Sequence, residues 1–332
     1  TVLKETGGKG IILNPSINDL VNDVQNSTLM SDFISGTPLN CLTPVYKEMH
    51  KHGIVVSMDG HGADEYLYGY QSSVLEALVN AYVEGNLDDA IQFEETLKNM
   101  SAAVAKEVIA SAKERAMFLR SMRKGVVHGL KRSLKSVMPV SSQNFYFPSF
   151  QTNVFFKNER INGRSISPLF DEGMTHGNMG EKQLLDEFHY TDLPYNLRDF
   201  DRGAMQHQME IRMPFMDYRL VTFCMALPQK SKLNNGYTKY ILREALKGIV
   251  PESIRTRKLK IGLSAPLVDW FNGPLNEFLL DTCHNAKLNS FEFLDHAKIK
   301  EEVAQRCKAR SWDNTSAQRI WSVVNLLLLS EN

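Results

Sequence analysis

Cysteine is scarce in this chain, and its spacing excludes the most common uses of that residue. Its 332 residues include 4 cysteines, and no two of them lie close together in the sequence. That spacing argues against a disulfide framework and against a structural zinc site. We therefore expect a protein of a reducing compartment, the cytoplasm. The cysteines are Cys41, Cys224, Cys283 and Cys307.

An excess of charge and a long apolar run are also lacking. Lys and Arg together number 38, as do Asp and Glu, so the formal net charge is zero. No general basic field exists to attract nucleic acid or an anionic membrane. The most apolar stretch, over residues 323–329, is too short to cross a bilayer. We predict no nucleic-acid partner and no membrane span.

The composition is that of a globular protein, and the pattern of apolar residues predicts an α/β fold. Hydrophobic residues make up 43% and charged residues 23% of the chain. A helix is predicted over 44–52, followed by a buried strand over 54–58, a glycine-rich turn and a second helix. This order is typical of a parallel sheet. Helical periodicity returns over 72–122 and 181–226, and Thr238 is predicted to cap a helix over 239–247. We expect a loop or lid over 144–156.

A glycine-rich loop with two carboxylates follows the predicted strand directly. It reads Asp59-Gly60-His61-Gly62-Ala63-Asp64-Glu65. The glycines permit a tight turn and the close approach of a ligand, and backbone amides at a strand-to-helix junction favour phosphate groups. Mg²⁺ is commonly shared between one or two carboxylates and substrate phosphates. The alternative, more frequent for so short a motif, is a tight turn that begins a helix.

Two further segments, residues 202–217 and 255–260, contain charged residues that could have a structural or a catalytic role. Glu210, Arg212 and Asp217 are interleaved with apolar residues, so we expect them to form salt bridges. Arg202, shortly before them, is suited to binding a planar carboxylate or a phosphate. A basic cluster over 255–260 is either a solvated loop or a source of a lysine, Lys260, that offsets charge developing on phosphates.

Taken together, the motifs resemble the synthetase domain of the asparagine synthetase family. The family's S-G-E-G-A-D-E-L-F-G-G-Y loop corresponds to residues 59–70, and its D-R-x-S-M-A-H-S-x-E-x-R-x-P-F-L-D motif to residues 201–217. Its T-K-x-x-L-R-E-A motif corresponds to residues 238–245, and its R-x-K-x-G-F-x-x-P-x-x-x-W motif to residues 258–270. The resemblance covers about residues 36–271, within which 72–180 is similar only in its helical character.

The resemblance implies a fold and a reaction. The fold is that of the ATP pyrophosphatases, which are adenine-nucleotide α-hydrolase-like: an α/β fold with a parallel sheet flanked by helices, here with a large helical portion. Residues 1–332 then form a synthetase domain truncated at its N-terminal side, with 72–180 as a helical insertion or variable region. In the implied reaction a carboxylate attacks the α-phosphate of ATP to give an acyl-adenylate and pyrophosphate. An amine or ammonia then displaces AMP.

The same resemblance assigns roles to residues at matching positions. Asp64 matches the carboxylate that holds Mg²⁺ on the pyrophosphate, and Lys260 matches the lysine that steadies charge on the phosphates. Gly60, Gly62 and Glu65 belong to the same nucleotide-binding loop, Glu65 as a supporting partner. The implied cofactors are therefore ATP and Mg²⁺.

The resemblance also assigns two positions near the acyl-adenylate intermediate, and one of them, His61, bears on which carboxylate is activated. Arg202 stands where the family has a basic residue near the adenylate. His61 replaces the glutamate implicated in amine transfer; a histidine can act as a general base near neutral pH but cannot be a permanent anion. Aspartate, giving asparagine, is the family's usual acceptor. A sugar acid, a peptide or a lactam precursor is the alternative acceptor.

The remaining expectations concern partners. The family's S-G-G-x-D-S pyrophosphate loop and its glutaminase domain are expected upstream of residue 1 or on another subunit. A split or non-catalytic subunit is the alternative reading. The implied partners are a small-molecule carboxylate, ammonia or an amine donor, and a glutaminase; a homodimer is compatible with the family. The basic residues Arg123, Lys124, Lys131 and Arg132 either bind a polyanionic or carrier-linked substrate or, as we favour, form a solvated helix face.

Overall fold

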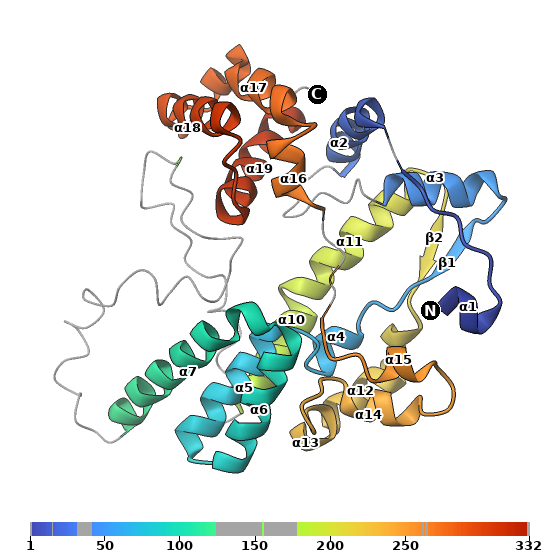
Figure 1. Cartoon of the computed structure of the whole chain (residues 1–332), viewed down its shortest axis with the longest axis vertical. Coiled ribbons are helices and arrows are strands. Elements are labelled where there is room, and N and C mark those ends of the chain that lie inside the picture. Colours follow the sequence, from blue (N-terminus) through green and yellow to red (C-terminus); the bar gives the residue numbers. More distant parts are fainter. Residues whose placement is uncertain are drawn as a thin grey trace.

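The protein is mainly helical, with one small parallel sheet among the residues that can be described (Figure 1). The computed structural model describes residues 2–14, 16–31, 42–123, 155, 178–260, 262 and 265–330. Strand β1 (Val56–Met58) pairs in parallel with β2 (Glu210–Arg212), and Val56 lies opposite Glu210. A parallel pair surrounded by helices agrees with the predicted α/β class.

The helices fall into three stretches of the chain. The first stretch holds α1 (Val2–Thr6), α2 (Ile17–Ser31), α3 (Thr43–Lys51), α4 (Ala63–Tyr66), α5 (Gln71–Glu84), α6 (Leu87–Met100) and α7 (Ala102–Arg123). The second holds α10 (Met179–His189), α11 (Asp192–Met205), α12 (Tyr218–Ala226), α13 (Gln229–Lys232), α14 (Tyr240–Ala245) and α15 (Glu252–Arg255), with a 3₁₀ turn at Pro214–Met216. The third holds α16 (Leu267–Asn272), α17 (Asn276–His284), α18 (His296–Ala309) and α19 (Asn314–Leu329), with a 3₁₀ turn at Ala286–Ser290.

The helix predicted over 44–52 leads into the strand as expected, but the strand is not buried. Pro44 lies in the first turn of α3, and Gly53, with φ of +72°, turns the chain toward β1. Ile54 is 42% exposed, Val55 52% and Met58 75%. The prediction of a buried strand is therefore wrong for the described residues, because β2 is the only strand among them that pairs with β1, and these apolar side chains remain largely exposed.

The region from residue 72 to residue 122 is helical, as predicted. Helices α5, α6 and α7 pack with α10 into a bundle. Gly85, with φ of +78°, ends α5, and the Asn86 side chain accepts a hydrogen bond from the Asp89 amide to begin α6. The core of the bundle includes Val74, Leu78, Phe93, Leu97, Ala112 and Leu184.

A second bundle brings α2 together with the C-terminal helices. Helices α16 to α19 share one apolar core, and Leu20 and Val24 of α2 are part of it. Helix α19 begins with a capping box in which Asp313 and Ser316 exchange hydrogen bonds. Other members of this core are Phe155, Phe271, Leu279, Ile299 and Trp321.

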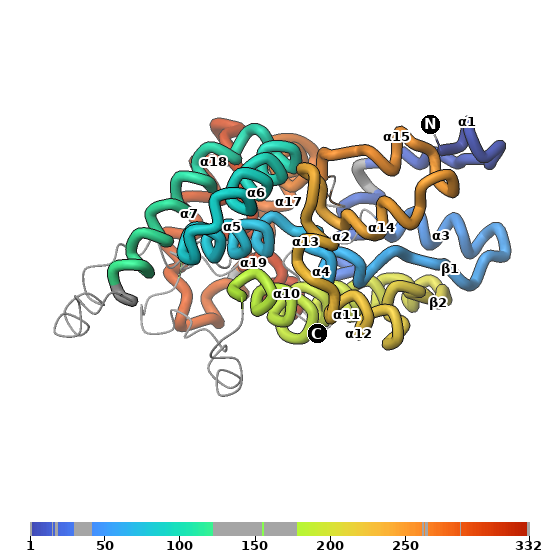
Figure 2. Tube along the Cα trace, turned by 90° about the horizontal axis from the view of Figure 1, so that it is seen from below, coloured from blue at the N-terminus to red at the C-terminus, as the bar shows by residue number. Residues whose placement is uncertain are grey.

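The loop after β1 lies between the sheet and the α5–α7 bundle. Figure 2 shows the bundle at one end of the molecule and the sheet with α3 at the other, with α4 between them. None of the described helices is both long and apolar enough to span a membrane.

Several local predictions have a clear outcome. Thr238 does not cap a helix, because α14 begins at Tyr240 and the preceding Lys239 is left-handed, with φ of +54°. Arg120 is part of α7 and donates to the carbonyl of Val83, so it has a structural contact. The segments 124–135 and 144–156 lie outside the described residues, except for Phe155, which is buried.

Candidate functional site

The loop at the carboxyl end of β1 is held by the sheet and by one essential glycine. The Asp59 amide donates to the Arg212 carbonyl at 2.9 Å, which extends the pairing one residue beyond β1. Gly62 has φ of +100°, and a Cβ there would lie 2.5 Å from the Met216 sulfur. A Cβ at Gly60 would meet no atom within 4 Å, so Gly60 borders open space. Of these two glycines, it is therefore Gly62 at which the loop requires glycine.

Two lysines from distant parts of the chain meet on Asp64. Its Oδ1 lies 2.8 Å from Lys239 Nζ and 3.0 Å from Lys260 Nζ. Burial opposes ionisation of Asp64, but the two ammonium groups outweigh that effect and lower its pKa. Two cations against one carboxylate leave a net positive charge at this point. The arrangement suits an additional anion, such as a phosphate group.

Backbone contacts fix the positions of Lys239 and Asp64. The Lys239 amide donates to the Leu67 carbonyl at 3.0 Å, which ties the segment before α14 to the end of α4. The Gly69 amide donates to the Asp64 carbonyl at 2.8 Å. A Cβ on Gly69 would lie 2.5 Å from Asp64 Cα, so only glycine fits there without a shift of the backbone.

Glu65 points into the protein, away from a direct ligand role. It is 2% exposed, and its Oε1 accepts a hydrogen bond from the Tyr70 hydroxyl at 2.7 Å. Burial raises the pKa of Glu65. The Tyr70 ring lies beneath the Lys260 ammonium, 5.0 Å from it, within the range of a cation–π contact. Glu65 therefore supports the lysine through Tyr70.

His61 contacts the helix that carries Arg202. Its ring centre lies 4.2 Å from that of Phe200 on α11, and its Nδ1 is 3.6 Å from Asp59 Oδ2, too far for a direct hydrogen bond. Burial lowers the pKa of His61, so its imidazole is neutral at pH 7. Arg202 is half-buried two residues further along α11. Of the predicted site residues, Asp64 and Lys260 therefore form an ion pair. His61 contacts Phe200 on α11, the helix that also carries Arg202.

The charged residues around β2 form pairs at the surface. Arg212 donates to Glu210 at 2.8 Å, and both side chains are largely exposed. Asp217 pairs with Arg219 at 2.6 Å and accepts from the Arg219 amide to begin α12. The prediction that Glu210, Arg212 and Asp217 form salt bridges is confirmed, but these salt bridges are exposed to solvent rather than enclosed by apolar residues.

Three residues near the site were not predicted as functional. Lys239 was visible as the lysine of the T-K-x-x-L-R-E-A motif, and Tyr70 as the last residue of the loop motif. Glu187 on α10 carries no sequence signal. It is fully buried, accepts from Ser72 at 2.5 Å and from Gln183 at 3.1 Å, and burial raises its pKa to about 8.

The side chains of the site could ligate a metal cation only if phosphate oxygens supplied the other ligands. Within the described part of the chain, no three His, Cys, Asp or Glu side chains gather in a way that would hold a metal ion. One carboxylate, Asp64, is available beside the lysines. Mg²⁺ is often held by one or two carboxylates together with substrate phosphates, so these residues fit Mg²⁺ bound to a polyphosphate.

Comparison with known proteins gives a family and several distant relatives. The family model described as asparagine synthase matches residues 29–331. The chain is 25% identical over 289 residues to asparagine synthetase [glutamine-hydrolyzing] 1 of Bacillus subtilis, which covers 86% of this chain and 41% of the relative. It is 33% identical over 104 residues to asparagine synthetase [glutamine-hydrolyzing] 3 of the same organism, covering 30% of this chain and 17% of the relative.

A relative with a different name matches a shorter stretch. The chain is 29% identical over 145 residues to amidase chry2 of Gibberella zeae, covering 42% of this chain and 21% of the relative. The chain therefore spans less than half of the length of each of these relatives. No solved structure gives a significant match.

Proposed function

The chain belongs to the asparagine synthase family, and on that premise we propose that it forms part of an ATP-dependent amide ligase. In the proposed reaction a carboxylate attacks the α-phosphate of ATP, and the oxygen bridging the α- and β-phosphates leaves with pyrophosphate. Ammonia or an amine then attacks the acyl carbon of the acyl-adenylate, and AMP leaves. The observation that carries this proposal is the contact of Lys239 and Lys260 with Asp64.

The three residues divide the work of binding a polyphosphate. On binding of a polyphosphate, Lys239 and Lys260 would exchange their ion pairs with Asp64 for ion pairs with phosphate oxygens. They would then offset the negative charge that develops as pyrophosphate leaves. Asp64, released from the lysines, would then hold Mg²⁺. When bound, Mg²⁺ neutralises phosphate charge. Tyr70 and Glu65 position Lys260, and Gly60 and Gly62 allow the loop to approach the phosphates.

His61 and Arg202 are proposed to act on the acyl side. The neutral imidazole of His61 can accept a proton from an attacking amine, as a general base requires. Arg202, on the helix that His61 contacts, can bind the carboxylate or the adenylate phosphate.

The exposed strand supports the proposal that further polypeptide completes the domain. Ile54, Val55 and Met58 are apolar and exposed around β1, which is unusual for a parallel strand because parallel sheets are normally covered on both faces. We propose an ATP-pyrophosphatase fold in which additional strands pair here and bring the pyrophosphate loop. In that arrangement residues 1–332 are one synthetase domain, 72–180 are its variable helical region, and a cytoplasmic glutaminase domain or subunit supplies ammonia.

Asparagine formation from aspartate is the primary candidate, since the relative matched over 289 residues and a second one matched over 104 residues are both named for it. His61 favours a second candidate, the amidation or cyclisation of another carboxylate. An imidazole that is neutral at pH 7 supplies no anion for the transfer step. A third reading, a subunit without catalysis, follows if the lysines do not bind nucleotide.

The test is pyrophosphate exchange into ATP by the full-length protein, with a panel of carboxylates. The proposal predicts exchange that depends on one carboxylate, with AMP as the product. Replacing Lys239 or Lys260 by Ala should lower the exchange rate about 100-fold. The matched control is Lys258→Ala, because Lys258 is a neighbouring lysine that lies 3.9 Å from Glu95 and has no described contact with Asp64. Formation of ADP and phosphate, or equal effects of all three substitutions, would refute it.

A further inference from the structure

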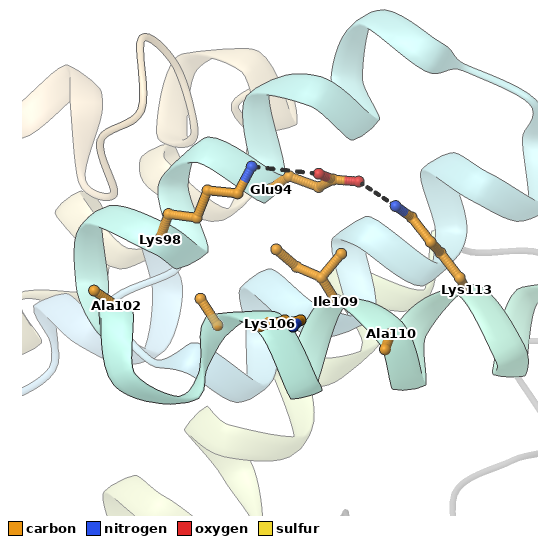
Figure 3. A pocket seen from close by; sticks show the side chains of 8 residues that line it. Glu94, Lys98, Ala102, Lys106, Ile109, Ala110 and Lys113 are labelled. Atoms are coloured by element: carbon orange, nitrogen blue, oxygen red, sulfur yellow. Dashed lines mark ion pairs between the residues drawn. The ribbon is translucent and has the colours of Figure 1, made fainter.

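The outer side of the α6–α7 hairpin carries a groove that the proposed reaction does not use. The two helices run antiparallel, with Ser101 between them, and their inner faces pack against α5. On the outer side lies a hollow of about 390 Å³ (Figure 3). Its lining residues come from both helices: Glu94, Lys98, Ala102, Ala105, Lys106, Ile109, Ala110 and Lys113. We call this the lysine groove.

Exposed apolar side chains continue the groove beyond the hollow. On α6, Leu87 is 68% and Ile91 67% exposed, and both share a face with Glu94 at helical spacing. On α7, Met117 is 71% exposed and lies one turn beyond Lys113. The contact of Lys113 with Glu94 fixes the antiparallel register, so Ile91 and Met117 lie toward the same end of the groove.

The charge of the groove is positive. Three lysines, Lys98, Lys106 and Lys113, line it with a single acid, Glu94. Lys113 lies 3.0 Å and Lys98 3.6 Å from the Glu94 carboxylate, which also accepts from the Tyr82 hydroxyl. Burial opposes ionisation of Glu94, but Tyr82 and these lysines lower its pKa, so the acid stays charged.

Lys106 adds a charge that no neighbour offsets. It is exposed and forms no ion pair with any other residue that the structure describes. Glu107 directly follows Lys106 and Glu114 directly follows Lys113, so each acid lies about 100° further round α7 than its lysine and points away from the groove. Among the residues that the structure describes, none covers this apolar floor with its positive rim, and its charge is opposite to that of an acidic partner.

The shape and length of the groove indicate the kind of partner. Two helices form its walls, and the lined stretch from Ala102 to Met117 is about 22 Å long at 1.5 Å per residue. A third helix of about 15 residues can lie between two antiparallel helices with its apolar side chains at i, i+3, i+4 and i+7. Acidic residues beside that apolar face would meet the lysines.

We propose that the lysine groove is a docking site for an acidic amphipathic helix of a partner protein. The site is separate from the Asp64 cluster, and the proposal does not depend on the reaction. The apolar face of the partner covers Ile91, Ile109 and Met117. Its carboxylates pair with Lys98, Lys106 and Lys113.

The test uses a designed probe with a matched control. The probe is a fluorescein-labelled peptide of about 15 residues with leucines at helical spacing and flanking glutamates. The control peptide has lysines in place of the glutamates. Fluorescence anisotropy with the whole chain should show the acidic peptide binding at least ten-fold more tightly, and Lys106→Glu or Ile91→Ser should weaken it about ten-fold. Lys308→Glu, which changes an exposed lysine of α18, should leave binding unchanged.

Three outcomes would overturn the proposal. They are no binding of the acidic peptide, equal binding of both peptides, and equal effects of Lys106→Glu and Lys308→Glu. Vesicles containing anionic phosphatidylglycerol test the alternative occupant. If Lys106→Glu and Ile91→Ser reduce vesicle binding but not peptide binding, the groove is a membrane surface and the proposal fails. Circular dichroism of each variant confirms that the bundle is folded.

Discussion

Gly60 and Gly62 are two residues apart in the loop after β1 but have different surroundings. Gly62 combines a positive φ with a close approach to Met216, whereas Gly60 has neither constraint. We expect Gly62→Ala to lower the free energy of unfolding by about 1–3 kcal/mol, because an alanine there is both strained and crowded. Gly60→Ala should change it by less than about 0.5 kcal/mol.

Urea unfolding of both variants measures this difference. Similar losses for the two would show that the loop adjusts to either side chain. Gly60→Ala still provides information about function: if phosphates approach the open side of Gly60, the variant should bind ATP more weakly while remaining as stable as the parent.

The buried carboxyl group of Glu187 makes stability depend on pH. Its folded pKa of about 8 lies above its ordinary value of 4.5, so the folded state binds the proton more tightly than the unfolded chain does. The stabilisation is complete below about pH 4.5 and is lost as the pH rises through 8, at up to about 1.4 kcal/mol per pH unit. We expect Glu187→Gln to reduce this decline.

Chemical denaturation at pH 5, 6, 7 and 8 provides the measurement. The parent should lose stability across that range and Glu187→Gln should lose less, since the amide remains neutral and can still accept from Ser72. Parallel curves for the two proteins would contradict a protonated Glu187 in the folded state.

The residues of the site could be predicted from sequence only in part. Asp64 and Lys260 belong to motifs, and the structure brings them together. The role of Lys239 depends on a left-handed backbone conformation and on a contact with Leu67, neither of which a motif encodes. The same holds for Glu187, whose environment is assembled from α5 and α10.

Among the elements, the C-terminal bundle depends on a few large side chains. Phe271 of α16 is fully buried, and its ring packs edge-on against Trp312 at 5.7 Å. We expect Phe271→Ala to lower the free energy of unfolding by about 3–5 kcal/mol through lost burial and a cavity. The control Phe293→Ala removes a ring that is 41% exposed and should cost about 1 kcal/mol or less.

Thermal unfolding followed by tryptophan fluorescence distinguishes the two, because Trp312 and Trp321 both lie in this core. Equal shifts in Tm would mean that the bundle contributes little to the overall stability. An early fluorescence transition in Phe271→Ala alone, with circular dichroism still showing helix at that temperature, would show that α16 to α19 unfold independently of the α5–α7 bundle.

Helices were more predictable than their ends and than the strand. The apolar periodicity over 72–122 follows from packing against a single core, which a sequence shows directly. The prediction that Thr238 caps a helix is wrong because the hydrogen bond from the Lys239 amide to the Leu67 carbonyl sets the start of α14. The prediction that β1 is buried is wrong because the burial of a strand depends on which other elements cover it. The residues of the strand itself do not reveal those elements.

At the scale of the whole molecule, the exposed apolar residues of β1 predict self-association of the isolated chain. In the described residues β1 pairs only with β2, and an exposed apolar strand edge binds other strands. We expect Val55→Thr with Met58→Gln to reduce both the binding of the dye ANS and the sedimentation coefficient of the isolated chain. Ile249→Thr, which removes an apolar residue that is 74% exposed and belongs to neither strand, serves as the control.

In the full-length protein the same double variant is expected to be harmful rather than beneficial. If further strands cover β1 there, the substitutions should destabilise that protein and leave its low ANS binding unchanged. No change in the isolated chain relative to the control would mean that β1 does not drive association.

The meeting of Lys239 and Lys260 on Asp64 also has a consequence for the order of events during protein synthesis. Asp64 leaves the ribosome long before either lysine, so the full contact waits until residue 260 has been made, although α16 to α19 are not needed for it. The Tyr66 hydroxyl, which donates to the Phe215 carbonyl 149 residues later, has to wait in the same way. Contacts so distant in sequence form late, after the local helices of the α5–α7 bundle. If the proposed role of the two lysines holds, a nascent chain that ends before Lys239 should therefore be unable to bind nucleotide, however well its first helices have folded.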